Sequence, residues 1–202
     1  MSDDERRPLA LLVCGALMRE VRDVVLRRGW DADLHAAPAL NHLSPKKLVA
    51  DVDDLLGELG PRYERVVVVY GDCGTNGALD AVLERHGAHR VSGPHCYEML
   101  GHPATQDAER LDPGLFFLTD WLVRNWDKAV VQGLGIDRFP YMKDTYFEHV
   151  TRLLFLRQEP EPALEERARG IAAWLDRPLE IVDVGLGDLE RRLVDLVEEP
   201  SV

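Results

Sequence analysis

The three cysteines are the residues of this sequence with the most distinctive chemistry. Cys14, Cys73 and Cys96 are the only cysteines among 202 residues. An odd number of cysteines in a chain that shows no export signal argues against a disulfide framework and favours free thiols or metal ligands. Thiolates are soft ligands that suit zinc or an iron-sulfur cluster, and three of them leave a coordination position open for histidine, water or substrate. We therefore interpret the three cysteines as candidate metal ligands.

Polar residues and glycines near two of the cysteines complement such a site. Carboxylates and imidazoles beside a thiolate can complete the coordination of a bound metal, orient a ligand or transfer a proton. The candidates for these roles are His95, His102, Asp72 and Glu98. Glycines allow a sharp turn and a close approach of the backbone to a bound group. The residues that we expect to contact a substrate are Gly71, Gly74, Tyr97 and Asp120.

Two other interpretations of the cysteines stay open, because their spacing matches no compact metal motif. The sequence contains no C-x-x-C pair, no H-E-x-x-H and no zinc-finger arrangement, and it also lacks a phosphate loop and a G-x-S-x-G elbow. A free cysteine often acts as a small buried hydrophobe. Alternatively, one cysteine with a histidine base would form a metal-free nucleophile, which explains one thiol but not three.

The elements that must position the cysteines follow from the apolar pattern. Residues 9–17 form an apolar run of strand length, and the amphipathic stretch 18–28 after it is closed by Gly29 as a helix C-cap. A second helix begins at Pro45. Residues 65–70, RVVVVY, contain a continuous apolar run after Arg65, as is typical of a strand covered by helices on both faces. This alternation predicts an α/β fold with a mostly parallel sheet of Rossmann-like strand-helix-strand units.

Three segments share this strand-helix-strand order and are interpreted as pseudo-repeats. They are residues 11–42, 67–99 and 152–190. Residues 103–150 contain most of the aromatic side chains, and the apolar spacing from Leu118 to Trp126 predicts extra helices there. No composition shift divides the chain, so we expect a flexible tail over 1–8 and a single domain over 9–195.

The predicted sheet would gather the cysteines at one edge. Ligands of an open parallel α/β sheet bind beyond the carboxyl ends of its strands. Cys14 ends the first predicted strand, Cys73 follows the strand at 65–70, and Cys96 follows a short strand near residue 90. The order of elements therefore predicts that three thiols from distant parts of the sequence converge.

The charge balance excludes several classes of partner. Asp and Glu outnumber Lys and Arg by 36 to 24, and no basic patch offsets the net charge of −12. This composition disfavours binding to nucleic acid or to an anionic membrane. The sequence also lacks an apolar run of the roughly 18 to 20 residues that a membrane span needs and lacks the apolar core of a signal peptide. We expect a cytoplasmic protein that acts on a small-molecule substrate.

Several short blocks of the sequence occur in a characteristic order. They are CGAL-x-x-E at 14–20, YGDCG at 70–74, HCYEMLGH at 95–102, PGLFFLTDWLVRNWD at 113–127, GLGIDRFPYMKDTYF at 133–147 and LLFLRQ at 153–158. Over roughly residues 10–190 the chain therefore resembles a prokaryotic family of unknown function, DUF1638. Some members occur beside corrinoid-dependent methyltransfer systems, so the resemblance implies a corrinoid or methyltransferase partner.

This resemblance favours zinc as the metal and a metal-dependent transferase or lyase as the activity. Zinc with cysteine ligands and an exchangeable position can activate a substrate thiol for methyl or one-carbon transfer. Three strand-helix units around three thiols are also similar in outline to quinolinate synthase, which makes an iron-sulfur enzyme the alternative, although the third segment here has no cysteine. A non-catalytic protein that handles metal or corrinoid, a metal-free cysteine hydrolase or transferase, and a homo-oligomeric assembly also remain open.

Overall fold

The chain divides into two compact units. The computed structural model describes residues 7–101, 105 and 112–198. The first unit comprises Met1–Cys96 and Leu189–Val202, and the second comprises Tyr97–Asp188. This division differs from the single domain expected over 9–195. The physical reason is that the strands pair into two separate sheets instead of one.

The first unit is built on a parallel sheet with the strand order β2-β1-β3-β4. Its strands are β1 (Arg7–Cys14), β2 (Asp33–Ala37), β3 (Tyr63–Val69) and β4 (His89–Arg90). The two central strands pair in register, with Leu12 opposite Val68. Both residues are fully buried, as expected for apolar strands that are covered on both faces. β1 begins at Arg7, so the last two residues of the tail expected over 1–8 belong to this strand.

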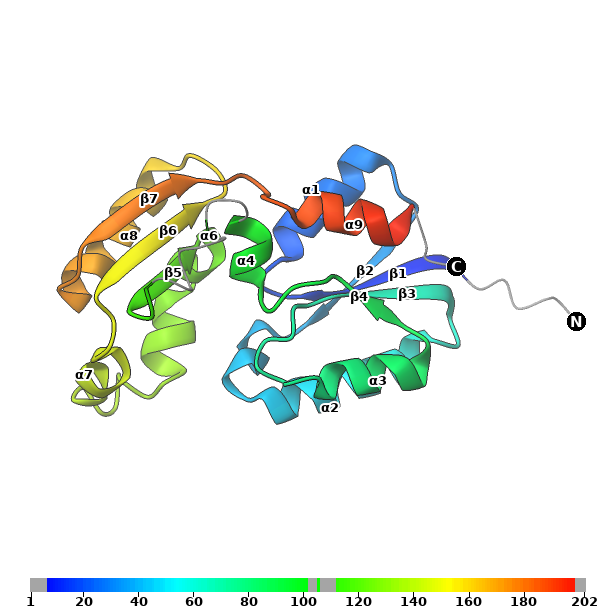
Figure 1. Cartoon of the computed structure of the whole chain (residues 1–202), viewed down its shortest axis with the longest axis horizontal. Helices are drawn as coiled ribbons and strands as arrows, with labels where there is room; N and C mark the ends of the chain where they lie inside the picture. The colour runs from blue at the N-terminus through cyan, green and yellow to red at the C-terminus, as the bar shows by residue number, and fades with distance from the viewer. Residues whose placement is uncertain (1–6, 102–104, 106–111, 199–202) are drawn as a thin grey trace, which may run out of the picture. The chain divides into compact units, whose positions relative to one another are not determined.

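Helices cover both faces of this sheet. They are α1 (Met18–Arg28), α2 (Pro45–Leu59), α3 (Ala78–His86) and α9 (Leu189–Val197), together with the 3-10 helix η1 (Ala39–Leu43). α1 and α9 lie on one face, and α2 and α3 lie on the other (Figure 1). The predicted bounds of α1 are confirmed, because Gly29 adopts a left-handed φ of 64° and ends the helix. Pro45 occupies the first turn of α2, as predicted.

The second unit has its own parallel sheet, with the order β5-β6-β7. Its elements are α4 (Cys96–Gly101), β5 (Leu115–Thr119), α6 (Asp120–Arg124), the π-helix η2 (Asp127–Gln132), α7 (Met142–Phe147), β6 (Arg152–Arg157), α8 (Pro162–Leu175) and β7 (Leu179–Asp183). Aromatic side chains fill its larger core, in which Trp126 and Phe147 lie 6.1 Å apart between ring centroids and Phe116 meets both rings edge-on. These aromatics therefore stabilise the unit by packing.

The prediction of helix from Leu118 onward is wrong at its start. Leu118 belongs to β5, and the helix begins only at Asp120. Thr119 between them has extended backbone geometry, and its hydroxyl accepts a hydrogen bond from the N–H of Leu122 at 3.3 Å. This cap fixes the change from strand to helix. Part of the helical region expected over 103–150 lies outside the described residues.

The α/β class is confirmed by the strand-helix-strand units. In each of the three segments interpreted as pseudo-repeats, a helix connects two neighbouring parallel strands: β1-α1-β2, β3-α3-β4 and β6-α8-β7. Within the described part of the chain, none of the helices has both the length and the apolar character of a membrane crossing.

Candidate functional site

The first sheet contains a topological switch point between its two central strands, β1 and β3, where the chain connections run to opposite sides of the sheet. From β1 the chain passes through α1 to β2 on one side, and from β2 it passes through α2 to β3 on the other side. The helices that follow β1 and β3, α1 and α3, cover opposite faces (Figure 1). Loops that diverge in this way leave a crevice at the carboxyl ends of the two strands, where α/β proteins commonly bind ligands. Cys14 is the last residue of β1, and Cys73 lies in the loop after β3.

Cys14 is enclosed at this switch point. Its side chain is 1% exposed. Burial raises the pKa of the Cys14 thiol to about 11, and the polar groups of Ala16, Tyr70 and Leu17 oppose the rise. The sulfur therefore stays a neutral thiol near pH 7.

Tyr70 is a site residue that the sequence reasoning missed. It directly follows β3 and is 1% exposed. The pKa of its phenol is raised first by burial and then by the neighbouring charges of Cys14 and Cys73 in their thiolate forms. The phenol thus lies within electrostatic range of both thiols. The sequence signal that could have identified Tyr70 is its hydroxyl group at the end of an otherwise apolar run.

Cys73 lies in a loop with left-handed backbone geometry. Its φ is 49°, an uncommon value for a residue with a side chain, and Gly74 follows with a φ of 79°. Burial raises the pKa of the Cys73 thiol to about 12, and the nearby Cys14 contributes in the same direction. A nucleophilic cysteine needs a lowered pKa. These surroundings therefore do not favour the metal-free nucleophile for Cys14 or Cys73.

Asp72 closes the loop that carries Cys73. One carboxylate oxygen accepts from the Thr75 hydroxyl at 2.8 Å and from the N–H of Gly77 at 3.0 Å, and the other accepts from the N–H of Asn76 at 3.1 Å. These donors hold the pKa of the Asp72 carboxyl below its usual value. The hydrogen bonds give this carboxylate a structural role, and its predicted acid-base role stays a prediction.

A second segment lies against the Cys73 loop and carries Cys96. The N–H of Cys73 donates to the carbonyl of Pro94 at 2.7 Å, and the N–H of Asp72 donates to the carbonyl of Gly93 at 3.1 Å. A Cβ built on Gly71 would lie 2.6 Å from the Cα of His95, which explains why this position is glycine. The structure thus brings the chain just before Cys96 next to Cys73.

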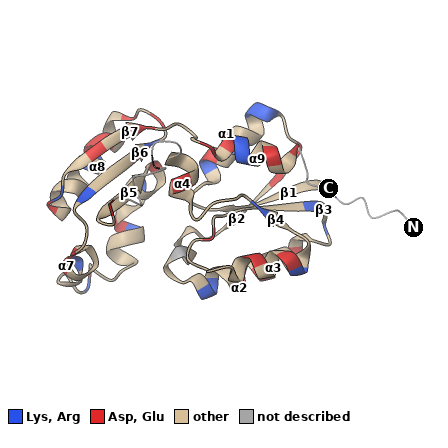
Figure 2. Ribbon diagram, in the orientation of Figure 1, with Lys and Arg blue, Asp and Glu red and all other residues tan. Residues whose placement is uncertain are grey.

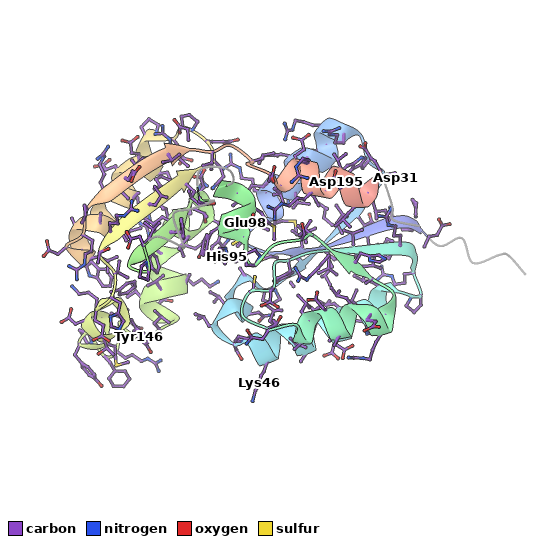
Figure 3. All side chains as sticks on the ribbon, viewed as in Figure 1. Asp31, Lys46, His95, Glu98, Tyr146 and Asp195 are labelled. Atoms are coloured by element: carbon purple, nitrogen blue, oxygen red, sulfur yellow. The ribbon has the colours of Figure 1, made fainter. Side chains whose placement is uncertain are left out.

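The remaining predicted residues fall in the second unit or outside the described residues. Tyr97 stacks on Phe117 with ring centroids 5.7 Å apart, and Glu98 is half-buried on α4, one turn after His95 in the preceding loop (Figure 3). Asp120 is buried, and its carboxylate accepts from the N–H of Gln158 at 3.1 Å, which links the ends of β5 and β6. His102 lies outside the described residues. The substrate contacts predicted for Tyr97 and Asp120 stay predictions.

A complete metal cluster is not preformed in the described part of the chain. Over residues 7–101, 105 and 112–198, no group of three or more His, Cys, Asp or Glu side chains is arranged to hold a metal ion. The backbone nevertheless places Cys14 and Cys73 at the ends of neighbouring chain segments and draws the Cys96 segment beside them. Three thiols are donors that fit zinc or an iron-sulfur cluster. Binding of one metal centre by all three cysteines requires a local movement of the chain.

The fold and the switch-point thiols define an α/β protein with a cysteine-containing edge, and sequence comparison then places it in a family. The model of the DUF1638 family, described as a protein of unknown function, matches residues 37–193. The chain therefore belongs to the DUF1638 family. Cys73 and Cys96 lie inside the matched range and Cys14 lies before it. Comparison with curated proteins and with solved structures finds no match.

Proposed function

We propose that this DUF1638 protein is a cytoplasmic metal-binding enzyme that acts on a small molecule at the carboxyl edge of its first sheet. Zinc is the first choice of metal, and an iron-sulfur cluster is the alternative. The observation that supports the proposal most strongly is the placement of Cys14 and Cys73 at the switch point between β1 and β3. Two such thiols are ligands that favour a soft metal ion.

The proposed ligand set uses all three cysteines. Cys14 would contribute from the end of β1 and Cys73 from its left-handed loop. Cys96 would be the third ligand, because the hydrogen bond from Cys73 to Pro94 holds the preceding segment against this loop. His95 and His102 are the proposed fourth ligand or proton-transfer groups.

The chemistry of such a centre suits methyl or one-carbon transfer. Zinc with cysteine ligands supplies a Lewis acid that favours the thiolate form of a substrate thiol. The chain's own contribution is to orient and shield. The polar groups of Ala16, Leu17 and Tyr70 lie near the Cys14 sulfur, and burial shields it from water. A corrinoid or methyltransferase partner and a homo-oligomeric state are further parts of this proposal.

Metal content tests the proposal. Elemental analysis and an absorption spectrum of the anaerobically purified chain should show about one zinc per chain without colour, or a brown chromophore for the iron-sulfur alternative. Cys14→Ser, Cys73→Ser and Cys96→Ser should each lower the bound metal sharply, because each removes one thiolate ligand.

His89→Ala serves as the matched control. His89 opens β4 and is exposed, so its loss removes a metal-capable side chain of the same unit without touching the proposed ligands. Metal stoichiometry that is unchanged in all three serine variants, with circular dichroism confirming their fold, would refute the metal site.

A further inference from the structure

A surface groove continues from the Cys73 loop in the first unit. Its volume is about 690 Å³, which lies in the range of small-molecule sites. One wall is the start of α2, with Ser44, Pro45 and Lys46, and the other wall is the loop that leads into α3, with Gly74 and Asn76. Because Gly74 directly follows Cys73, a molecule in this groove would lie next to the proposed metal ligand.

The groove lining offers hydrogen-bond donors and one cation, and the nearest carboxylate, Asp72, is already bound by the Thr75 hydroxyl and the N–H of Asn76. No Asp or Glu occurs among its described lining residues. Lys46 extends from the start of α2 into solvent (Figure 3) and makes no ion pair with any described residue. The neighbouring Lys47, in contrast, binds Asp51 at 2.5 Å. The Ser44 hydroxyl makes no capping bond with α2, so it too is available to a ligand.

This charge pattern is unusual for the molecule. The chain has a net charge of −12. Two grooves in the second unit have linings of mixed charge. One is lined by Asp127, Glu166 and Arg167, and the other by Glu161, Glu165, Glu166, Arg157 and Arg169. Figure 2 shows a basic segment at the start of α2. The lining of the groove beside the Cys73 loop therefore carries a formal positive charge from Lys46, whereas acidic side chains outnumber basic ones in the linings of these two grooves.

We propose that this groove binds the anionic head group, a carboxylate or a phosphate, of the small-molecule substrate. The inference rests on the proposed function, because it places the rest of the substrate at the switch-point cysteines. Lys46 would close over the head group, with the Ser44 hydroxyl and the Asn76 amide as further donors. Pro45 and Val49 provide apolar surface for the body of the molecule.

A nuclear magnetic resonance titration of the full chain tests the proposal. Sodium phosphate and sodium acetate are added to ¹⁵N-labelled protein at constant ionic strength and pH 7.5. Either anion should shift the amide signals of Ser44, Lys46, Gly74 and Asn76 in a saturable way. Saturation by phosphate alone or by acetate alone identifies the head group. The absence of saturable shifts with both anions overturns the proposal.

Variants separate a specific site from general electrostatics. Lys46→Gln should lower the affinity for the anion by about threefold or more, which is the scale of one exposed charge pair. Lys47→Gln should change the affinity by less than about twofold. Ala78→Glu places a carboxylate in the groove and should abolish saturation, and Ala81→Glu adds the same charge to α3 outside the groove lining. Equal effects within either pair would overturn the site.

The same titration in Cys73→Ser keeps the two proposals distinguishable. Cys73→Ser should lose its metal and keep its anion binding. A wild-type chain that binds the anion but holds no metal leaves the groove intact and refutes only the metal site. A chain that binds metal but shows no saturable anion shifts refutes only the groove.

Discussion

The N–H of Cys73 donates a 2.7 Å hydrogen bond to the carbonyl oxygen of Pro94. This bond joins the loop after β3 to the segment that leads into α4. Arg90 anchors the same segment from the other end, because its guanidinium donates to the carbonyls of Val91 and Gly93 at 3.1 and 3.3 Å. The position of Cys96 relative to Cys73 is therefore set by backbone contacts and not only by side-chain packing.

Gly71→Ala should disturb this contact. The new methyl group would lie 2.6 Å from the Cα of His95, and backbone atoms cannot move aside as a flexible side chain can. We expect a loss of about 1–3 kcal/mol in the free energy of unfolding. Urea denaturation followed by circular dichroism measures it.

Gly57→Ala is the matched control for that variant. Gly57 lies in the interior of α2, and no described atom would come within 4 Å of a Cβ there. Alanine should stabilise the helix by about 0.5–1 kcal/mol. A Gly71→Ala variant as stable as Gly57→Ala would show that the segment 93–95 is not held against the loop.

Tyr70 should matter to stability mainly through its ring. The side chain is 1% exposed at the switch point, so Tyr70→Ala should cost about 3–5 kcal/mol, as for other large aromatic truncations in cores. Tyr70→Phe keeps the ring and removes only the hydroxyl that lies beside Cys14, so it should cost at most about 1.5 kcal/mol. A similar loss for both variants in urea denaturation would contradict this division between ring and hydroxyl.

Asp112 should make the stability of the second unit depend on pH. Its carboxylate accepts from Arg152 at 2.7 Å and from the N–H of Gly114 at 3.0 Å, and Arg152 also pairs with Glu180. The guanidinium holds the pKa of the Asp112 carboxyl below its usual value. A lowered pKa in the folded state means that the stabilisation is complete above the unfolded value of about 3.9 and is lost as the pH falls through the folded value.

Melting temperatures measured from pH 7 to pH 3 test this sign. Asp112→Asn should melt below the wild type at pH 7, and the difference should shrink below about pH 4, where the wild-type carboxylate also becomes protonated. Asp54→Asn, on the exposed face of α2 and without an ion pair to any described residue, should show no such convergence. A difference that grows toward acid pH would reverse the argument.

Local signals in the sequence were sufficient to predict several elements. Gly29 ends α1 because a left-handed residue cannot continue the helix, and Pro45 begins α2 because its missing N–H is not needed in the first turn. The prediction of a mostly parallel sheet followed from the continuous apolar run of β3 and from the alternation of strands and helices, and the parallel pairing of β1 with β3 agrees with it. These features depend on neighbours within a few residues, so they are visible without a structure.

The division into two units was not predictable in the same way. The boundary between Cys96 and Tyr97 falls inside α4, where no linker composition marks it. Whether β5 extends the first sheet or pairs with β6 depends on contacts between distant residues. Apolar spacing around Leu118 also fits both a helix and a strand, and only the cap at Thr119 distinguishes them.

The candidate site shows the same limit. The placement of Cys14 and Cys73 at strand ends followed from the sequence, whereas the importance of Tyr70 required knowledge of which strands are adjacent. The carboxylate of Asp120 binds the N–H of Gln158, 38 residues later, and no local pattern predicts such a partner.

Because α9 belongs to the first unit, the first unit cannot complete its folding until the end of the chain has been synthesised. Leu189 and Leu193 are completely buried, and Glu190 binds Arg28 of α1 at 2.9 Å, so α9 covers part of the α1 face of the first sheet. A ribosome synthesises every residue of the second unit before it reaches Leu189. During that interval the apolar surface under α9 has no cover, and it is the surface that a nascent-chain chaperone would meet.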